Sequence, residues 1–123
     1  EIALIDARKG IDMFLTDKVN VPVLGIVENM SWFTPEELPN NKYYIFGNGG
    51  GARLAEELGL PLLGQIPLVQ GVCEAGDQGV PVALRENTIL AEYFSDLADR
   101  VAKQVALRNE TLPETKKVIV SKH

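Results

Sequence analysis

Residues 21–33 read VPVLGIVENMSWF, and this stretch decides the fold. Its first part, Val21–Val27, is a short apolar run that is rich in β-branched residues. Runs of this kind are typical of strands that are buried on both faces of a parallel sheet. Asn20 and Pro22 punctuate the chain at its start. The sequence therefore predicts a central strand at Val21–Val27.

A second apolar run and two helical patterns surround this strand. The run Pro61–Ile66 predicts a second buried strand. Apolar residues recur at intervals of three and four in Ile2–Leu15 and in Ile89–Val105, which predicts a helix in each segment. Asn87 or Thr88 is the candidate N-cap of the later helix.

The connecting segments are rich in glycine, proline and polar residues. The polar stretch at residues 30–46 predicts a long loop, and long loops tend to be functional or mobile. The stretch ARLAEELG, residues 52–59, predicts a short helix that Gly59 caps. Pro67 is expected to close the second strand, because proline cannot donate to a strand ladder. Residues 71–81, GVCEAGDQGVP, predict a helical turn and a loop.

The order helix, strand, helix, strand, helix predicts the α/β class. Two strands are few for a parallel sheet, so we expect further strands upstream of Glu1, which is also not a methionine. We expect residues 1–107 to form the C-terminal part of one domain. Residues 108–123 are polar and charged, and they are expected to form a loose tail.

Composition excludes several classes of function. The 123 residues carry 17 acidic and 12 basic side chains, a net charge of -5, so no broad cationic surface is expected for nucleic acid. No apolar run approaches the roughly 20 residues of a membrane span, and no export signal is visible. The single thiol, Cys73, cannot form an internal disulfide, which favours a cytoplasmic location.

Three blocks resemble consecutive blocks of the Mrp/ApbC family of P-loop iron-sulfur cluster carriers: VPVLGIVENMSWF, YYIFGNGGGARLAEELGLPLLGQIPL and EAGDQGVPVAL. The segment IALIDARKGIDMF also resembles the helix that precedes them. Several blocks in order, over about residues 2–100, are more specific than one short motif. The resemblance implies the C-terminal part of a P-loop NTPase, a three-layer αβα fold with a parallel sheet.

The resemblance implies three residues at the adenine of a bound nucleotide. In the family a strand that ends in V-x-N places its asparagine at the base, which corresponds to Asn29. An amide group can pair with the N6 and N7 edge of adenine, whereas the residues alone favour an asparagine that turns the chain. The block QIPL implies Pro67 and Leu68 beside the base. Pro67 could also simply end its strand, and both roles are compatible.

The phosphate-binding part of such a site is absent from the sequence. FGNGGG, residues 46–51, precedes a helix, but no Gly-Lys pair occurs anywhere in the chain, so a Walker A loop is missing. The resemblance implies that these glycines form a turn before a helix. It also places the residues for phosphate and magnesium in the N-terminal half. We therefore expect this chain alone to be inactive as an ATPase, with ATP and Mg²⁺ bound by the full-length parent.

The sequence departs from the family at the iron-sulfur cluster. Many members carry Cys-x-x-Cys between the N-M-S and I-F-G blocks, where this chain has WFTPEELPNNKYY without a cysteine. Thiolates are the usual ligands of such clusters, so cluster binding at that place is in doubt. Cys73 gives one thiol per chain and is expected to be a buried or half-buried thiol. His123, the only histidine, ends the chain.

Aromatic residues bracket the segment that replaces the cysteines: Trp32, Phe33, Tyr43 and Tyr44. They predict either a protein contact, near the family's dimer interface, or a small cluster that packs the loop onto its own domain. The leading interpretation is part of an Mrp-like ATPase that assembles or transfers iron-sulfur clusters, self-associates as a homodimer and meets client proteins. The alternative is a partner-binding or dimerisation module that holds no cluster.

Overall fold

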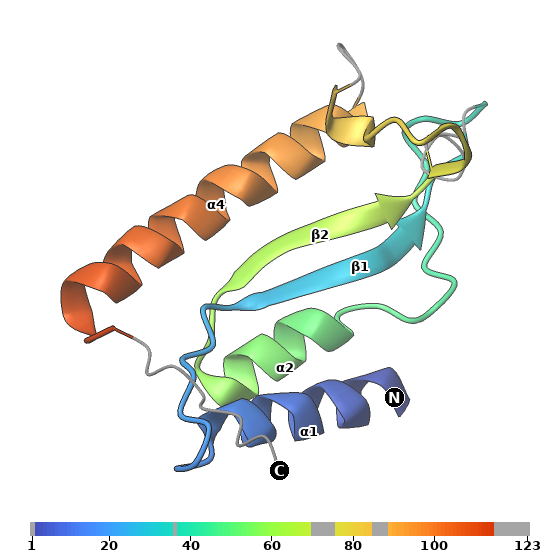
Figure 1. Cartoon of the computed structure of the whole chain (residues 1–123). Helices are drawn as coiled ribbons and strands as arrows, with labels where there is room; N and C mark the ends of the chain where they lie inside the picture. The colour runs from blue at the N-terminus through green and yellow to red at the C-terminus, as the bar shows by residue number, and fades with distance from the viewer. Residues whose placement is uncertain (1, 36, 70–75, 85–88, 115–123) are drawn as a thin grey trace, which may run out of the picture.

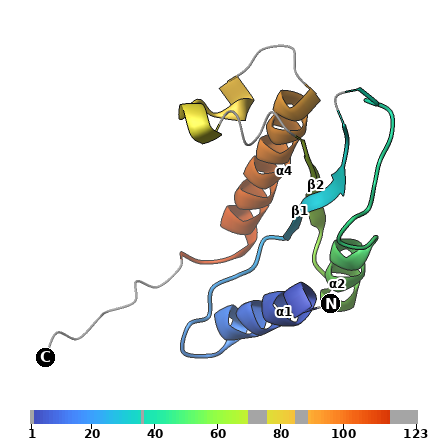
Figure 2. The ribbon, with the colours of Figure 1, turned by 90° about the vertical axis from the view of Figure 1, so that its right-hand side faces the viewer.

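A computed structural model of the chain describes residues 2–35, 37–69, 76–84 and 89–114. In chain order the elements are helix α1 (Ile2–Leu15), strand β1 (Ile26–Phe33), helix α2 (Gly50–Leu58), strand β2 (Leu62–Leu68), the 3-10 turn η1 (Val82–Leu84) and helix α4 (Ile89–Thr111). Figure 1 shows α4 on one face of the sheet and α1 and α2 on the other, and Figure 2 shows the same three layers from the side.

The two strands pair in parallel, with Ile26 opposite Leu62 and Asn29 opposite Ile66. Parallel strands need a crossover, and α2 supplies it here. In the part of the chain that the structure describes, the sheet consists of these two strands. The α/β class with a parallel sheet between layers of helices is confirmed.

The first strand begins and ends later than the sequence predicts. The predicted range is Val21–Val27, whereas β1 covers Ile26–Phe33 and takes in the start of the expected loop. At Gly25 the chain comes close to the residue that precedes β2. A Cβ atom at this position would lie 2.8 Å from the carbonyl oxygen of Pro61, and glycine avoids this contact. Glu28, Asn29 and Ser31 interrupt the apolar pattern of β1, so this part of the strand resembles a loop in sequence. The prediction of a strand at Val21–Val27 is thus wrong in its bounds.

The second strand does not close at Pro67. It continues to Leu68, and Pro67 is buried within it. The backbone N–H of Thr34 donates to the carbonyl of Leu68 at 3.3 Å, so the backbone of Leu68 faces β1. Because neighbouring residues of a strand face opposite sides, Pro67 faces away from β1, where the ladder needs no donor. Proline is therefore tolerated inside this strand.

The helices follow the predicted periodicity. α1 matches its predicted bounds, and α2 ends at Gly59, whose φ of 66° is the left-handed conformation that glycine adopts without strain. The predicted helix from Ile89 is confirmed as α4, although its candidate caps, Asn87 and Thr88, lie outside the described residues. Residues 76–78 are helical, in agreement with the helical turn predicted within residues 71–81.

Helix α4 continues to Thr111, past the position at which the sequence predicts the start of the tail. Local hydrogen bonds support its last turn. Thr111 Oγ1 donates to the carbonyl of Leu107 at 2.9 Å, and Arg108 Nη2 donates to the carbonyl of Pro113 at 2.7 Å. Polar residues continue a helix as well as apolar ones when the surrounding face is solvent. The division of the chain near residue 107 stays a prediction.

The core lies on both faces of the sheet and is small. Its buried apolar residues are Ile11, Trp32, Leu54, Ala55, Leu63, Ile66 and Leu90. Gly64 lets α4 approach β2 closely, since a Cβ atom there would stand 3.1 Å from Leu97 Cδ1. None of the helices in the described ranges has the length and apolar composition that crossing a bilayer requires.

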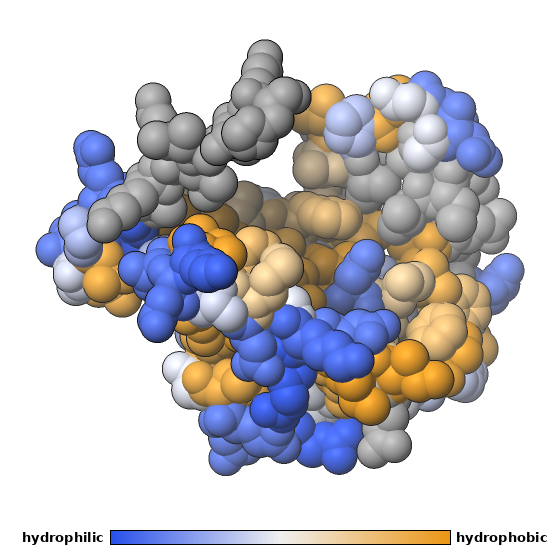
Figure 3. All heavy atoms as spheres, turned by 60° about the horizontal axis from the view of Figure 1, so that its bottom comes forward, coloured by the Kyte–Doolittle hydropathy of each residue, from blue (hydrophilic) through white to orange (hydrophobic). Residues whose placement is uncertain are grey.

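Apolar side chains also remain exposed on the outer layer. Figure 3, which turns the lower side of Figure 1 toward the viewer, shows apolar areas between hydrophilic ones. On α1 the exposed apolar side chains are Ile2, Ile5, Met13, Phe14 and Leu15. Exposed apolar area costs roughly 25 cal/mol per Å² relative to burial, so this layer favours further contacts.

Candidate functional site

Asn29 lies in β1 with an exposed side chain. Its Oδ1 accepts the backbone N–H of Met30 at 2.9 Å. Met30 has a φ of 53°, which is uncommon for a residue with a side chain, and the strand register becomes irregular between Asn29 and Phe33. Asn29 therefore stands at the start of a bulge in β1, and it does not end the strand as the V-x-N pattern predicts.

Pro67 and Leu68 are the last two residues of β2. Asn29 is opposite Ile66, the residue just before Pro67, and Leu68 is opposite Phe33. Because the strands are parallel, their carboxyl ends lie at the same edge of the sheet, where open α/β sheets bind ligands. Pro67 and Leu68 thus lie at this end of the sheet, whereas Asn29 lies in the middle of β1, opposite Ile66.

Glu28 is a site residue that the sequence analysis missed. Its carboxylate accepts hydrogen bonds from the backbone N–H of Gly51 at 2.5 Å, from Gln65 Nε2 at 3.3 Å and from the hydroxyl of Ser31. A cavity of about 430 Å³ is lined by Glu28 and Asn29, together with Ser31, Phe46, Asn48 and Arg53. A charged residue between strand residues is the signal that could have found it, because a half-buried carboxylate favours hydrogen-bond partners.

The glycine loop before α2 is a turn, and an amide in the first turn of the helix that it leads to is already engaged by Glu28. Gly47 and Gly49 have φ of 100° and 78°, and the helix begins at Gly50 without a side-chain cap at Gly49. The Glu28 carboxylate accepts the N–H of Gly51 and so takes the place that a bound anion would occupy. The turn that the resemblance implied for these glycines is confirmed.

The aromatic residues form a cluster that joins the loop to α4. Trp32 is 6% exposed. Its ring lies 5.7 Å from that of Tyr93 and 6.5 Å from that of Tyr44, and Lys42 Nζ stands 4.3 Å from its centre. This arrangement favours the interpretation in which the loop packs onto its own domain. Ile45 and Phe46, at the end of the loop, are the most exposed of its large apolar residues, and Leu38, Tyr43 and Tyr44 are also exposed.

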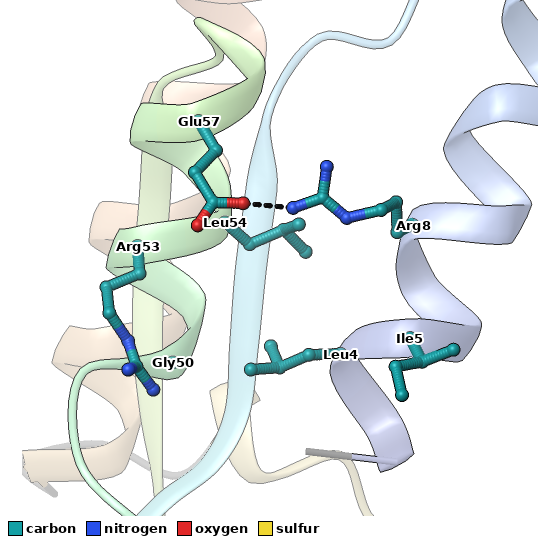
Figure 4. A pocket seen from close by; sticks show the side chains of 7 residues that line it. All are labelled: Leu4, Ile5, Arg8, Gly50, Arg53, Leu54 and Glu57. Atoms are coloured by element: carbon teal, nitrogen blue, oxygen red, sulfur yellow. Dashed lines mark hydrogen bonds and ion pairs between the residues drawn. The ribbon is translucent and has the colours of Figure 1, made fainter.

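A second cavity, of about 310 Å³, lies between α1 and α2. Figure 4 shows Leu4 and Leu54 directed toward each other across it, while Arg8 reaches Glu57 in an ion pair. Both charged side chains are largely exposed, so solvent screens the pair and its contribution to stability is at most about 1 kcal/mol. This cavity is separate from the residues at the sheet edge.

Metal ligands are not gathered in the part of the chain that the structure describes. Among residues 2–35, 37–69, 76–84 and 89–114, no group of three or more His, Cys, Asp and Glu side chains could hold a metal ion. Cys73 and His123 lie outside these ranges. The burial expected for Cys73 therefore stays a prediction.

Comparison with known proteins identifies similar chains. The model of the NUBPL iron-transfer P-loop NTPases, in the ParA group, matches residues 1–102. An iron-sulfur cluster carrier protein of Synechocystis is 43% identical over 107 residues, which are 86% of this chain and 30% of that protein. The Escherichia coli iron-sulfur cluster carrier protein is 46% identical over 114 residues, 92% of this chain and 30% of that protein.

A plant protein is similar to this chain to a comparable degree. The mitochondrial iron-sulfur protein required for NADH dehydrogenase of Arabidopsis thaliana is 45% identical over 104 residues, 84% of this chain and 32% of that protein. The chain thus spans about a third of the length of the curated relatives it matches.

Proposed function

Because this chain belongs to the NUBPL iron-transfer P-loop NTPase family, we propose that it forms the adenine side of a nucleotide pocket. The longer protein would be an ATPase that assembles or transfers iron-sulfur clusters. The observation that supports this is the pairing of Asn29 with Ile66, the residue before Pro67 and Leu68 at the carboxyl end of β2.

The amide of Asn29 suits the edge of an adenine ring. The bond from the N–H of Met30 defines which end of the amide is the oxygen. That oxygen keeps a second lone pair for the adenine N6 amino group, and Nδ2 keeps donors for N7. Leu68, which is half-buried, offers apolar surface for the base, and the buried Pro67 sets the backbone that precedes it. The residues present therefore fit a purine base.

The same chain does not fit the triphosphate or its magnesium ion. It has no Gly-Lys pair, and Glu28 engages the N-terminus of α2. Phosphoryl transfer requires a lysine, backbone amides around the phosphates and a hydroxyl on Mg²⁺. We place these groups in the rest of the longer protein, and we expect the 123-residue chain alone to show no magnesium-dependent ATPase activity.

The iron-sulfur cluster would be the cargo of the longer protein. The names of the relatives support iron-sulfur client proteins as partners. The chain lacks the family's Cys-x-x-Cys, and its single thiol, Cys73, gives two in a homodimer, fewer than the four ligands that clusters usually take. Cluster binding by this segment is therefore not part of the proposal. The proposal does include self-association as a homodimer and a cytoplasmic location.

A partner-binding module is the second candidate. Ile45 and Phe46 are exposed at the end of the loop, and large apolar side chains in such positions favour protein contacts. If partner binding is the main function, replacing both residues with serine would weaken binding to the partner protein and leave nucleotide affinity unchanged. Reduced nucleotide affinity in that variant would argue against it.

The proposed function is tested by Asn29→Ala in a chimaera. Residues 1–102 of this chain would replace the matching segment of the Escherichia coli relative. The variant loses one or two hydrogen bonds to the base, each worth about 1 kcal/mol net, so the Kd for ATP should rise about five- to thirtyfold. Titration calorimetry measures this. Asn40→Ala, at an exposed loop position, is the control, and equal affinities in all three proteins would contradict the assignment.

A further inference from the structure

Glu28 connects three elements through one carboxylate. Oε2 accepts the N–H of Gly51 in the first turn of α2, and Oε1 accepts Gln65 Nε2 from β2. The hydroxyl of Ser31, which lies further along β1 and is almost fully buried, donates to the same Oε1. Hydrogen bonds to an ionised group are among the stronger ones in proteins, so these contacts constrain all three elements.

The contact with α2 is close. A Cβ atom at Gly51 would lie 2.5 Å from Glu28 Oε2 and 2.9 Å from Glu28 Cβ. Gly51 is buried, and glycine is the residue that permits this approach. The carboxylate therefore has little freedom to move relative to the first turn of the helix.

The hydrogen bond between Glu28 and Ser31 spans the bulge of β1. Between these residues lie Asn29 and Met30, whose left-handed φ of 53° is maintained by its surroundings. Within the same turn, the N–H of Met30 donates to Asn29 Oδ1. The two hydrogen bonds together fix the direction of the Asn29 amide.

We infer that Glu28 is a positioning residue for purine recognition: it orients Asn29 by holding the bulge of β1 against α2 and β2. The inference rests on the proposed function, because it assumes that Asn29 meets the base. Glu28 itself needs no contact with the nucleotide. Replacing Glu28 should therefore weaken binding of the base, and it should do so only when Asn29 is present.

The test is a double-mutant cycle in the same chimaera, with Kd values for ATP and for inorganic tripolyphosphate, which has no base. Glu28→Ala should raise the Kd for ATP about tenfold and change that for tripolyphosphate less than about twofold. Adding Glu28→Ala to Asn29→Ala should weaken ATP binding little further, because residues that act through one contact are not additive.

Two further variants define the mechanism. Glu28→Gln should keep ATP affinity within about threefold, because its amide oxygen can accept from Gly51 and its amide nitrogen can donate to Ser31, and to Gln65 once the Gln65 amide turns its oxygen toward it. Glu56→Ala removes a carboxylate from an exposed position on α2 and should change nothing. If Glu28→Ala does not fold, Ser31→Ala, which removes only the bond across the bulge, should show the same loss through Asn29.

Three results would overturn the inference. The first is an equal loss for ATP and tripolyphosphate, which would indicate a general effect on the fold. The second is full additivity with Asn29→Ala. The third is unchanged ATP affinity in the folded Glu28 and Ser31 variants. An Asn29→Ala variant that binds ATP normally would instead refute the proposed function, and the inference would fail with it.

Discussion

Replacing Trp32 with alanine should lower the free energy of unfolding by about 3–5 kcal/mol. The indole is 6% exposed and lies against the rings of Tyr93 from α4 and Tyr44 from the loop. Its removal would leave a cavity between β1, the loop and α4, in a chain whose buried apolar set is small. Because small domains are stable by about 5–15 kcal/mol, this loss is a large share of the total.

Urea unfolding followed by far-ultraviolet circular dichroism measures the loss, since tryptophan fluorescence disappears with Trp32. Phe46→Ala is the matched control, because it removes an aromatic ring that is 70% exposed and should change stability by less than about 0.5 kcal/mol. A shift in midpoint for Trp32→Ala no greater than that for Phe46→Ala would show that the aromatic cluster does not support the fold.

The chain should self-associate, and a lysine on the outer edge of β1 should abolish the association. Within the described residues each strand has one neighbouring strand, and an isolated bridge from Phe33 to Tyr43 covers the end of the outer edge of β1, so most of each outer edge is unpaired. The edge of β2 is poorly suited to pairing, because Pro67 offers no donor and Arg100 Nη1 donates to the carbonyl of Leu63 at 3.2 Å. The edge of β1 has Val27 half-exposed and is the better template for another strand.

Light scattering at tens of micromolar should give at least twice the mass of one chain for the wild type and the mass of one chain for Val27→Lys. Lysine on an edge strand opposes pairing with a second strand. Val105→Lys, on α4, is the control, since its side chain is 40% exposed against 43% for Val27. A wild-type monomer, or equal effects of the two lysines, would exclude association through β1.

The sequence predicted the helices and the parallel arrangement well, because periodicity and glycine caps are local signals. The spacing in α1 and α4 and the cap at Gly59 are visible without tertiary structure. The family resemblance indicated Asn29, Pro67 and Leu68; the structure pairs Asn29 with Ile66, the residue before Pro67, although Asn29 lies inside β1 and not at its end. Their contact with adenine stays a proposal.

The features that sequence alone does not predict depend on partners that are distant in the chain. The polar residues within β1 resemble a loop in sequence because the distant partners of Glu28 cannot be seen from periodicity. Gly51 is separated from Glu28 by 23 positions and Gln65 by 37. Likewise, Pro67 fits inside β2 because its backbone nitrogen faces away from β1. The pairing of the two strands determines this direction, and the sequence does not reveal it.

The most direct measurement of the central claim is photolabelling of the chimaera with 2-azido-ATP, followed by mass mapping of tryptic peptides. An azide on the purine labels residues beside the base. We expect the label in residues 19–42, which contain Asn29, and in residues 54–85, which contain Pro67 and Leu68, with protection by excess ATP. Label found only in the segments contributed by the Escherichia coli relative would contradict the claim that this chain forms the adenine side of the pocket.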